Sequence, residues 1–228
     1  MGTDIHLYVE RFNGERWEEI EPPYETPYGD KTWNPYYENY RSDHGNPDPM
    51  RRNYLAFAFL ADVRNRYGFA NIPTHKRIKP MFPERGFPHD TSWEEPQYKN
   101  SKRISGSTWL GDHSYTWATL TELLNAPWDI EFQSVGVVNK DGFSSFKERG
   151  YPLSWMGDIV GGGARIWSQE TYEVILANGE VTENDFTRIS WSWRPLEDCH
   201  FRRWLTEVLA PMAEGDTDGI RVLMGFDS

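Results

Sequence analysis

Apolar and polar side chains alternate along the start of the chain. Within residues 4–12, Ile5, Leu7 and Val9 fall on one face, and Asp4, His6, Tyr8 and Glu10 fall on the other. A period of two is typical of a β-strand that has one apolar face. Asn13-Gly14 follows and is the strongest short signal for a hairpin turn, so we expect residues 17–20 to form the returning strand.

Three segments have the apolar spacing and the start signals of helices. We expect a largely buried helix at about 50–66, a short helix at about 117–125 that Thr116 caps, and a third at about 196–212. Further strands, and a hairpin turn at Asn178-Gly179, are expected. The predicted strands lie at 130–138, 165–168, 172–177, 188–193 and 220–226.

Two segments, at about 22–50 and 69–116, are rich in proline and polar residues and show no clear period. We expect them to be long loops, and such loops are often functional. The sequence shows no internal repeat and no convincing domain boundary. The pattern therefore predicts an α+β fold for residues 1–228, with a mixed or antiparallel sheet, about three helices and a single domain.

Aromatic residues make up 15 % of the chain. Either they fill the core, or several of them line a pocket for a planar ligand, since a base stacked on an aromatic ring contributes roughly 1–3 kcal/mol. The net charge of −11 argues against duplex nucleic acid or a membrane surface as a partner.

The charge is unevenly placed, because residues 51–106 carry +6 between flanks of −7 and −10. This basic centre is either a solvated face or the surroundings of a compact anionic ligand such as a nucleotide. A patch of this kind is often completed across a symmetric interface, which favours a homo-oligomer.

The sequence is typical of a protein from a reducing cytoplasm. The chain has one cysteine, Cys199, so it forms no internal disulfide. Its acidic start without an apolar stretch predicts no signal peptide, and no run of about 18 apolar residues predicts a membrane span.

Common catalytic signatures are missing. There is no Gly-rich phosphate loop with Lys-Ser or Lys-Thr, no dinucleotide fingerprint, no Gly-x-Ser-x-Gly elbow, and no His-Glu-x-x-His or cysteine-pair zinc motif. Candidate chemistry therefore rests on looser clusters of polar side chains.

Two of these clusters contain carboxylates. Asp4 and His6 share the polar face of the first predicted strand, which suits a metal pair or an acid–base pair; a hydrogen-bonded strand face is the alternative. The second cluster runs from Arg85 to Ser92 and includes Asp90, with a purely structural loop as its alternative.

A third cluster extends from Trp109 to Trp117 and contains His113 and Ser114. It precedes a predicted helix, whose free N–H groups favour an anion, and its tryptophans offer a stacking surface. A capped helix with anchoring tryptophans is the alternative interpretation.

Arg52-Asn53-Tyr54 opens the first predicted helix, where an arginine can hold a phosphate through two hydrogen bonds. The candidate ligand-binding residues are Arg52, Tyr54, Arg85, Ser92, Trp109, His113, Ser114 and Trp117. If the protein is an enzyme, the candidate catalytic residues are Asp4, His6, Asp90 and His113. These residues indicate no particular cofactor and leave a divalent metal open.

The clusters occur in a distinctive order along the chain. The order is Asp4-Ile5-His6, Arg52-Asn53-Tyr54, Leu60-Ala61-x-Val63-Arg64, Arg85-Gly86-x-Pro88-x-Asp90-x-Ser92, His113-Ser114-x-x-Trp117 and a last strand with Arg221-Val222 and Phe226-Asp227. This order resembles a group of uncharacterised proteins encoded by tailed bacteriophages, over nearly the whole chain. The resemblance implies a phage accessory protein in the cytoplasm of the infected bacterial host. Small phage proteins are often counter-defence factors, some of which bind or destroy nucleotide second messengers.

Three functions are compatible with these observations. The first is a sponge that binds and sequesters a small anionic nucleotide, of the cyclic-oligonucleotide or ADP-ribose type, to counter bacterial immunity; the lack of a clean catalytic motif favours it. The second is a metal-dependent phosphodiesterase or related hydrolase that degrades such a nucleotide. The third is an acidic protein that inhibits a host defence protein directly.

Overall fold

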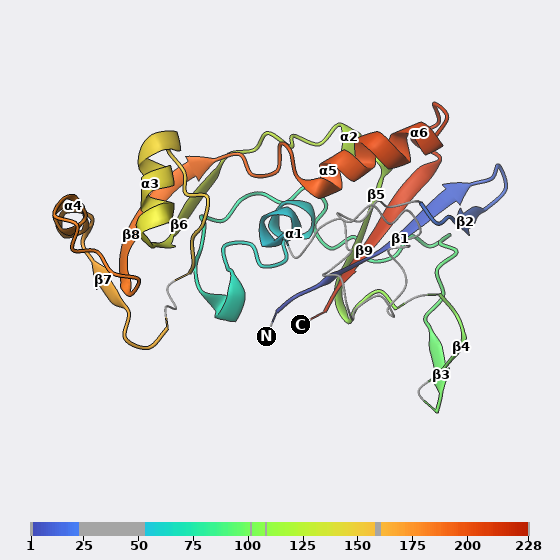
Figure 1. Ribbon diagram of the computed structural model, residues 1–228. Helices are drawn as coiled ribbons and strands as arrows, with labels where there is room; N and C mark the ends of the chain where they lie inside the picture. The colour runs from blue at the N-terminus through green and yellow to red at the C-terminus, as the bar shows by residue number, and fades with distance from the viewer. Residues whose placement is uncertain (1, 23–52, 101, 108, 158–160, 228) are drawn as a thin grey trace. The chain divides into compact units, whose positions relative to one another are not determined.

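The computed structural model describes residues 2–22, 53–100, 102–107, 109–157 and 161–227 (Figure 1). They group into two compact units, each made from separate stretches of the chain. Unit 1 comprises Met1–Val63, Lys79–Trp128 and Leu196–Ser228, and unit 2 comprises Arg64–Ile78 and Asp129–Pro195. Because the chain passes between the units four times, no single point in the sequence marks a boundary. The single domain therefore stays a prediction.

Unit 1 is built on a four-stranded antiparallel sheet. Its strand order is β2-β1-β9-β5, so strands from the two ends of the chain are neighbours. The strands are β1 (Ile5–Phe12), β2 (Trp17–Glu19), β5 (His113–Thr119) and β9 (Ile220–Phe226). A separate hairpin pairs β3 (Gln97–Lys99) with β4 (Lys102–Ser105).

The described residues of unit 1 form five helical segments. The segments are α1 (Tyr54–Ala61), α2 (Leu120–Leu124), α5 (His200–Trp204), the π-helical η3 (Leu205–Leu209) and α6 (Ala210–Met212). Helices α1, α2 and α5 each begin at a side chain that caps them. Asn53 starts α1 by accepting a hydrogen bond from the backbone N–H of Ala56. Phe57 of α1 meets the ring of Phe226 at 5.4 Å, so α1 packs on the face of the sheet that bears Phe226.

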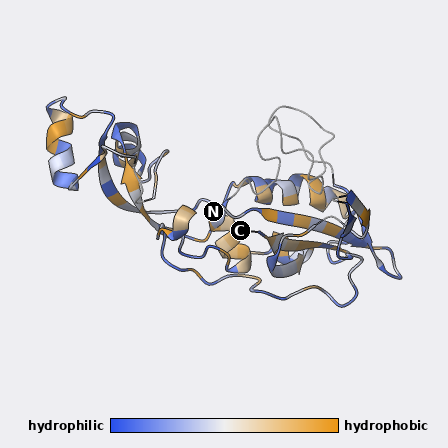
Figure 2. Ribbon diagram, turned by 90° about the horizontal axis from the view of Figure 1, so that it is seen from below, coloured by the Kyte–Doolittle hydropathy of each residue, from blue (hydrophilic) through white to orange (hydrophobic). Residues whose placement is uncertain are grey.

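Both faces of β1 are covered. Its aliphatic positions are buried, as the alternation predicts, and hydrophobic and hydrophilic residues alternate along the strands of this sheet in Figure 2. On the opposite face, Tyr8 and Glu10 are buried as well. The Ser92 hydroxyl lies within hydrogen-bond distance of both, which places the segment around Ser92 over this second face.

Unit 2 contains a three-stranded mixed sheet in the order β6-β8-β7. Strands β6 and β8 are antiparallel, whereas β7 and β8 are parallel. The elements are η2 (Phe69–Asn71), β6 (Phe132–Val138), α3 (Lys140–Arg149), β7 (Arg165–Trp167), α4 (Gln169–Ala177) and β8 (Asp185–Trp193).

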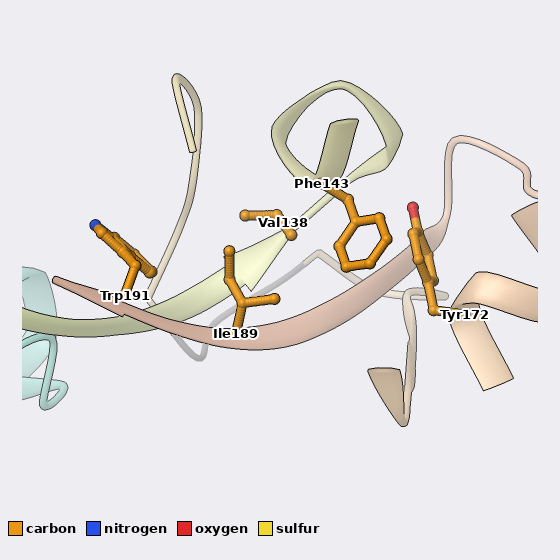
Figure 3. Packing of buried hydrophobic residues seen from close by; sticks show 5 residues of the cluster. All are labelled: Val138, Phe143, Tyr172, Ile189 and Trp191. Atoms are coloured by element: carbon orange, nitrogen blue, oxygen red, sulfur yellow. The ribbon is translucent and has the colours of Figure 1, made fainter. Parts of the chain in front are cut away.

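An aromatic core holds α3 and α4 on this sheet. Val138, Phe143, Tyr172, Ile189 and Trp191 form one buried cluster (Figure 3). The rings of Phe143 from α3 and Tyr172 from α4 meet edge to face at 5.3 Å. Much of the aromatic content therefore fills the core, as one of the two interpretations of the composition predicts.

Asp185 fixes the start of β8 to β7. Its buried carboxylate accepts hydrogen bonds from Nε1 of Trp167 at 2.6 Å and from the backbone N–H of Thr182 at 2.8 Å, and pairs with Arg165 at 2.8 Å. These donors, the indole first, hold the pKa of Asp185 well below its usual value.

The α+β class and the mixed sheet are confirmed, and the three predicted helices correspond to α1, α2 and the run from α5 to α6. The strand predicted at 172–177 is wrong, because these residues belong to α4, which Ser168 caps through the N–H of Thr171. Asn178-Gly179 ends that helix and is no hairpin turn. Thr116 lies within β5, and Thr119 caps α2 instead.

The predicted loops have a mixed outcome. Residues 23–50 lie outside the described residues, and the segment 69–116 contains η2, β3, β4 and the start of β5. Among the described residues, no helix combines the length and the apolar character needed to cross a membrane.

Candidate functional site

Polar side chains from several segments meet at the end of the sheet of unit 1 where β1 begins and β9 ends. Nε2 of His6 lies 3.3 Å from Oδ2 of Asp227, and the other oxygen of Asp227 accepts the backbone N–H of Asp4 at 2.9 Å. The ring of Trp109 lies 4.8 Å from that of His6. The hydroxyl of Tyr54 accepts the N–H of Thr3 at 3.3 Å.

We call Asp4, His6, Trp109 and Asp227 the strand-end cluster. The antiparallel register explains why they meet, because pairing Ile5 with Phe226 brings the start of β1 to the end of β9. Trp109 belongs to the chain that leads into β5. Tyr54, in the first turn of α1, lies at the same end of the sheet but on the Phe226 face that α1 covers, opposite to His6. The side chains of His6 and Asp227 are each 19 % exposed, so this pair is partly shielded from water but accessible.

A tight turn holds Trp109 in this place. The backbone N–H of Asp112 donates to the carbonyl of Phe226 at 2.8 Å, and the Tyr115 hydroxyl donates to the carbonyl of Gly111 at 2.8 Å. Gly111 has a φ of 83°, and a Cβ at this position would collide with the carbonyl of Phe226. Only glycine combines this backbone conformation with so close an approach to β9.

His113 and Ser114 lie at the same end of the sheet, at an irregular point of β5. The register of β5 against β9 shifts between His113 and Thr116, and Ser114 adopts a left-handed φ of 55°. Oγ of Ser114 lies 2.9 Å from Nδ1 of His113. A bulge of this kind re-aims side chains, and left-handed non-glycine residues are uncommon.

His6 and His113 nevertheless belong to opposite faces of the sheet. His6 pairs with Gly225 and His113 pairs with Phe226, and consecutive strand residues point to opposite faces. The His113 ring stacks near Phe226, on the side that α1 covers. The predicted partnership of the two imidazoles in one catalytic set is therefore not supported by the register.

Asp90 lies at the other end of β1. Its carboxylate pairs with Arg221 at 2.8 Å and accepts Nε1 of Trp17 at 3.0 Å. Arg221 pairs in register with Glu10, four residues beyond His6 and about 13 Å along the strand. The hydrogen bond from Arg221 is the main reason that the pKa of Asp90 is below its usual value. Asp90 thus belongs to a structural network and not to the strand-end cluster.

That network is centred on a buried ion pair between Glu10 and Arg221, whose side chains are 0 % and 3 % exposed. The Arg221 guanidinium lies 3.9 Å from the centre of the Trp17 ring and 5.8 Å from that of Trp117. Its Nη2 is buried and has no hydrogen-bond acceptor among the described residues.

Ser92 belongs to this network, because its backbone N–H and its hydroxyl both donate hydrogen bonds to the carboxylate of Glu10. The hydroxyl of Thr91 donates to the same carboxylate at 2.7 Å. The Tyr8 hydroxyl lies 3.1 Å from the Ser92 hydroxyl, and burial raises the pKa of Tyr8. The predicted role of Ser92 in ligand binding would require it to leave Glu10.

Arg85 also already has a partner within the protein, the carboxylate of Glu122. Its guanidinium forms two hydrogen bonds of 3.0 Å to the carboxylate of Glu122 and lies over the rings of Phe82 and Trp117. Burial raises the pKa of Glu122, but hydrogen bonds from Arg85 and from the N–H of Thr119 bring it below its usual value. A phosphate at Arg85 would have to displace this carboxylate.

The structure therefore divides the predicted site. It joins Asp4, His6 and Trp109, places Tyr54 on the other face of the sheet, and places Asp90, Ser92 and Trp117 in or beside the buried network. Arg52 lies outside the described residues. Within the described part of the chain, no group of three His, Cys, Asp or Glu side chains could hold a metal ion.

Sequence reasoning missed the roles of Asp227, Glu10 and Arg221. Glu10 shares the polar face of β1 with His6, and Arg221 and Asp227 flank an apolar run in the last strand, so each carried a weak signal. Comparisons of the chain with protein-family models, curated proteins and solved structures give no match.

Proposed function

We propose that the protein binds and sequesters a small anionic nucleotide, of the cyclic-oligonucleotide or ADP-ribose type, at the strand-end cluster. It acts as a phage accessory protein in the cytoplasm of the infected host, where removal of the signal counters bacterial immunity. The observation that carries the proposal is the convergence of His6, Trp109 and Asp227 from three separate segments at one accessible end of the sheet.

The chemistry of these side chains suits a nucleotide. The Trp109 ring offers a stacking surface, worth roughly 1–3 kcal/mol for one base. Asp227 holds the ring of His6 through Nε2, which leaves Nδ1 for a hydrogen bond to the ligand.

The test is retention of nucleotides from a panel of cyclic dinucleotides, cyclic trinucleotides and cyclic ADP-ribose isomers. Purified protein is incubated with the panel and filtered, and the filtrate is analysed by chromatography before and after heat denaturation. We expect one nucleotide to disappear and to return intact on heating. His6→Ala should abolish retention, whereas His89→Ala, which removes an exposed imidazole outside the cluster, should not.

A hydrolase acting on the same nucleotides is the second candidate, because a carboxylate that orients an imidazole is also the arrangement of a general base. His6 would take a proton from the attacking water or hydroxyl, and Asp227 would hold the ring in place. In the same experiment, this function predicts that the nucleotide returns as a cleaved product. If no nucleotide is retained by the wild-type protein, both candidates fall and direct inhibition of a host protein becomes the leading function.

A further inference from the structure

A second surface, in unit 2, has the properties of a recognition element. The segment Arg64–Ile78 folds back on itself, with Tyr67 bridged to Pro73 and the N–H of Gly68 bonded to the carbonyl of Ile72 at 2.9 Å. The short helix η2 forms its tip. We call this segment the cationic hairpin.

The base of the cationic hairpin is anchored by buried polar side chains. The Asn65 amide accepts the N–H of Ile78 at 3.0 Å and donates to the carbonyl of Ile78 at 2.7 Å. Nε2 of His75 accepts the N–H of Arg66 at 2.9 Å. The N–H of Lys76 bonds to the neighbouring strand β6 at the carbonyl of Gln133, 2.8 Å away. The hairpin is therefore held as a built element of the unit.

Its backbone is strained. Arg64, Arg66, Ala70 and Asn71 have positive φ angles of 55°, 93°, 56° and 58°. Such conformations are uncommon for residues other than glycine, and each is unfavourable, so four within one short segment require compensation from the surroundings. Strain of this kind concentrates at ligand clamps and other functional sites. A glycine-rich turn would have avoided this cost.

The exposed surface of the hairpin combines positive charge with aromatic rings. The segment 64–78 contains four basic residues and no acidic one, in a chain with a net charge of −11. Phe69 at the tip is 62 % exposed and Tyr67 is 36 % exposed. The Arg66 guanidinium lies 5.6 Å from the centre of the Tyr67 ring, and Lys76 is exposed at the base.

We propose that the cationic hairpin binds single-stranded nucleic acid. Phe69 and Tyr67 stack on unpaired bases, and Arg66 and Lys76 contact the phosphates between them. Single strands fit better than a duplex, because a duplex buries the base faces that Phe69 would need. They also fit better than an acidic protein, which would use the charge but leave the aromatic tip without a planar partner. This site is separate from the strand-end cluster and does not depend on its ligand.

The test is fluorescence anisotropy of labelled single-stranded RNA and DNA of about 12 nucleotides, with a duplex of the same sequence for comparison. We expect the full-length protein to bind the single strands more tightly than the duplex, and affinity to fall as salt rises. Phe69→Ala should weaken binding by about five-fold or more, the effect of losing one stacked base. Lys76→Gln should make the slope of log affinity against log salt concentration shallower, by the amount that corresponds to the loss of about one phosphate contact.

The matched control is Tyr98→Ala, which removes a 50 % exposed ring from the other basic hairpin, β3–β4. It should leave binding unchanged. Phe69 is exposed, so its replacement should not disturb folding, and an unchanged melting temperature verifies this. Equal binding by Phe69→Ala and wild type, an equal loss with Tyr98→Ala, or a preference for the duplex would overturn the proposal.

Discussion

Acidification should destabilise unit 2 through His75. This imidazole is 3 % exposed, its ring meets that of Phe132 at 5.6 Å, and its Nε2 accepts the backbone N–H of Arg66. Protonation at Nε2 would remove that acceptor and place a charge in the core. Burial lowers the pKa of His75 to about 4, from a usual 6.5.

The size and the sign of the effect follow from linkage. Between the two pKa values the unfolded chain binds a proton that the folded chain does not, so stability rises with pH. The contribution of neutral His75 is fully present above pH 6.5 and is lost as the pH falls towards 4. A shift of this size corresponds to about 3 kcal/mol in total, of which about 2 kcal/mol is lost between pH 7 and pH 5.

The assay is urea unfolding at pH 7 and pH 5 for the wild-type protein and His75→Gln. Glutamine keeps an acceptor for the Arg66 N–H and does not titrate, so it isolates the proton from the hydrogen bond. The wild-type protein should lose about 2 kcal/mol more than the variant over this range. Equal losses would refute the reasoning, as would an imidazole nitrogen NMR shift showing His75 protonated at pH 6 in the folded protein.

Three further predictions concern other parts of the fold. Glu10→Gln removes the negative charge that pairs with the buried guanidinium of Arg221, and it should lower the free energy of unfolding, measured by thermal unfolding, by about 3–5 kcal/mol. A decrease below about 1 kcal/mol would contradict the interpretation of Glu10 and Arg221 as a desolvated ion pair. Gly111→Ala forces a Cβ against the Phe226 carbonyl at a positive φ and should cost about 1–3 kcal/mol in urea unfolding, unlike Gly161→Ala, where the space is open. Asp185 has a lowered pKa, so its stabilisation is present above pH 3.8 and lost below it. Asp185→Asn should therefore lose less stability than wild type on acidification from pH 5 to pH 3; parallel losses would be inconsistent with this.

Local patterns in the sequence predict the strands of unit 1 well. The alternation along β1 and the apolar run of β9 place both strands within about one residue of their observed bounds. In α4, β-branched and aromatic residues favoured a strand, but the cap at Ser168 and the packing of Tyr172 in the core favour a helix. Tertiary packing outweighed propensity there.

The site was only partly predictable, because burial of charge depends on distant partners. From the sequence alone, Glu10 is expected to be exposed, because it lies on the polar face of a strand. Its burial depends on pairing with Arg221, which is 211 residues away in the sequence. The shared face of Asp4 and His6 follows from the strand period, which the sequence shows. The separation of His113 from His6 follows from its pairing with Phe226, which no local pattern reveals.

The central claim is that a small anionic nucleotide binds at the strand-end cluster, and covalent mapping of the bound ligand tests it most directly. The nucleotide retained in the filtration experiment is prepared with a photoreactive azido-purine, cross-linked to the full-length protein, and located by peptide mass spectrometry. We predict adducts on Trp109 or on the segments that carry His6 and Asp227, with competition by unlabelled nucleotide. Competed adducts confined to unit 2 or to the β3–β4 hairpin would contradict the claim.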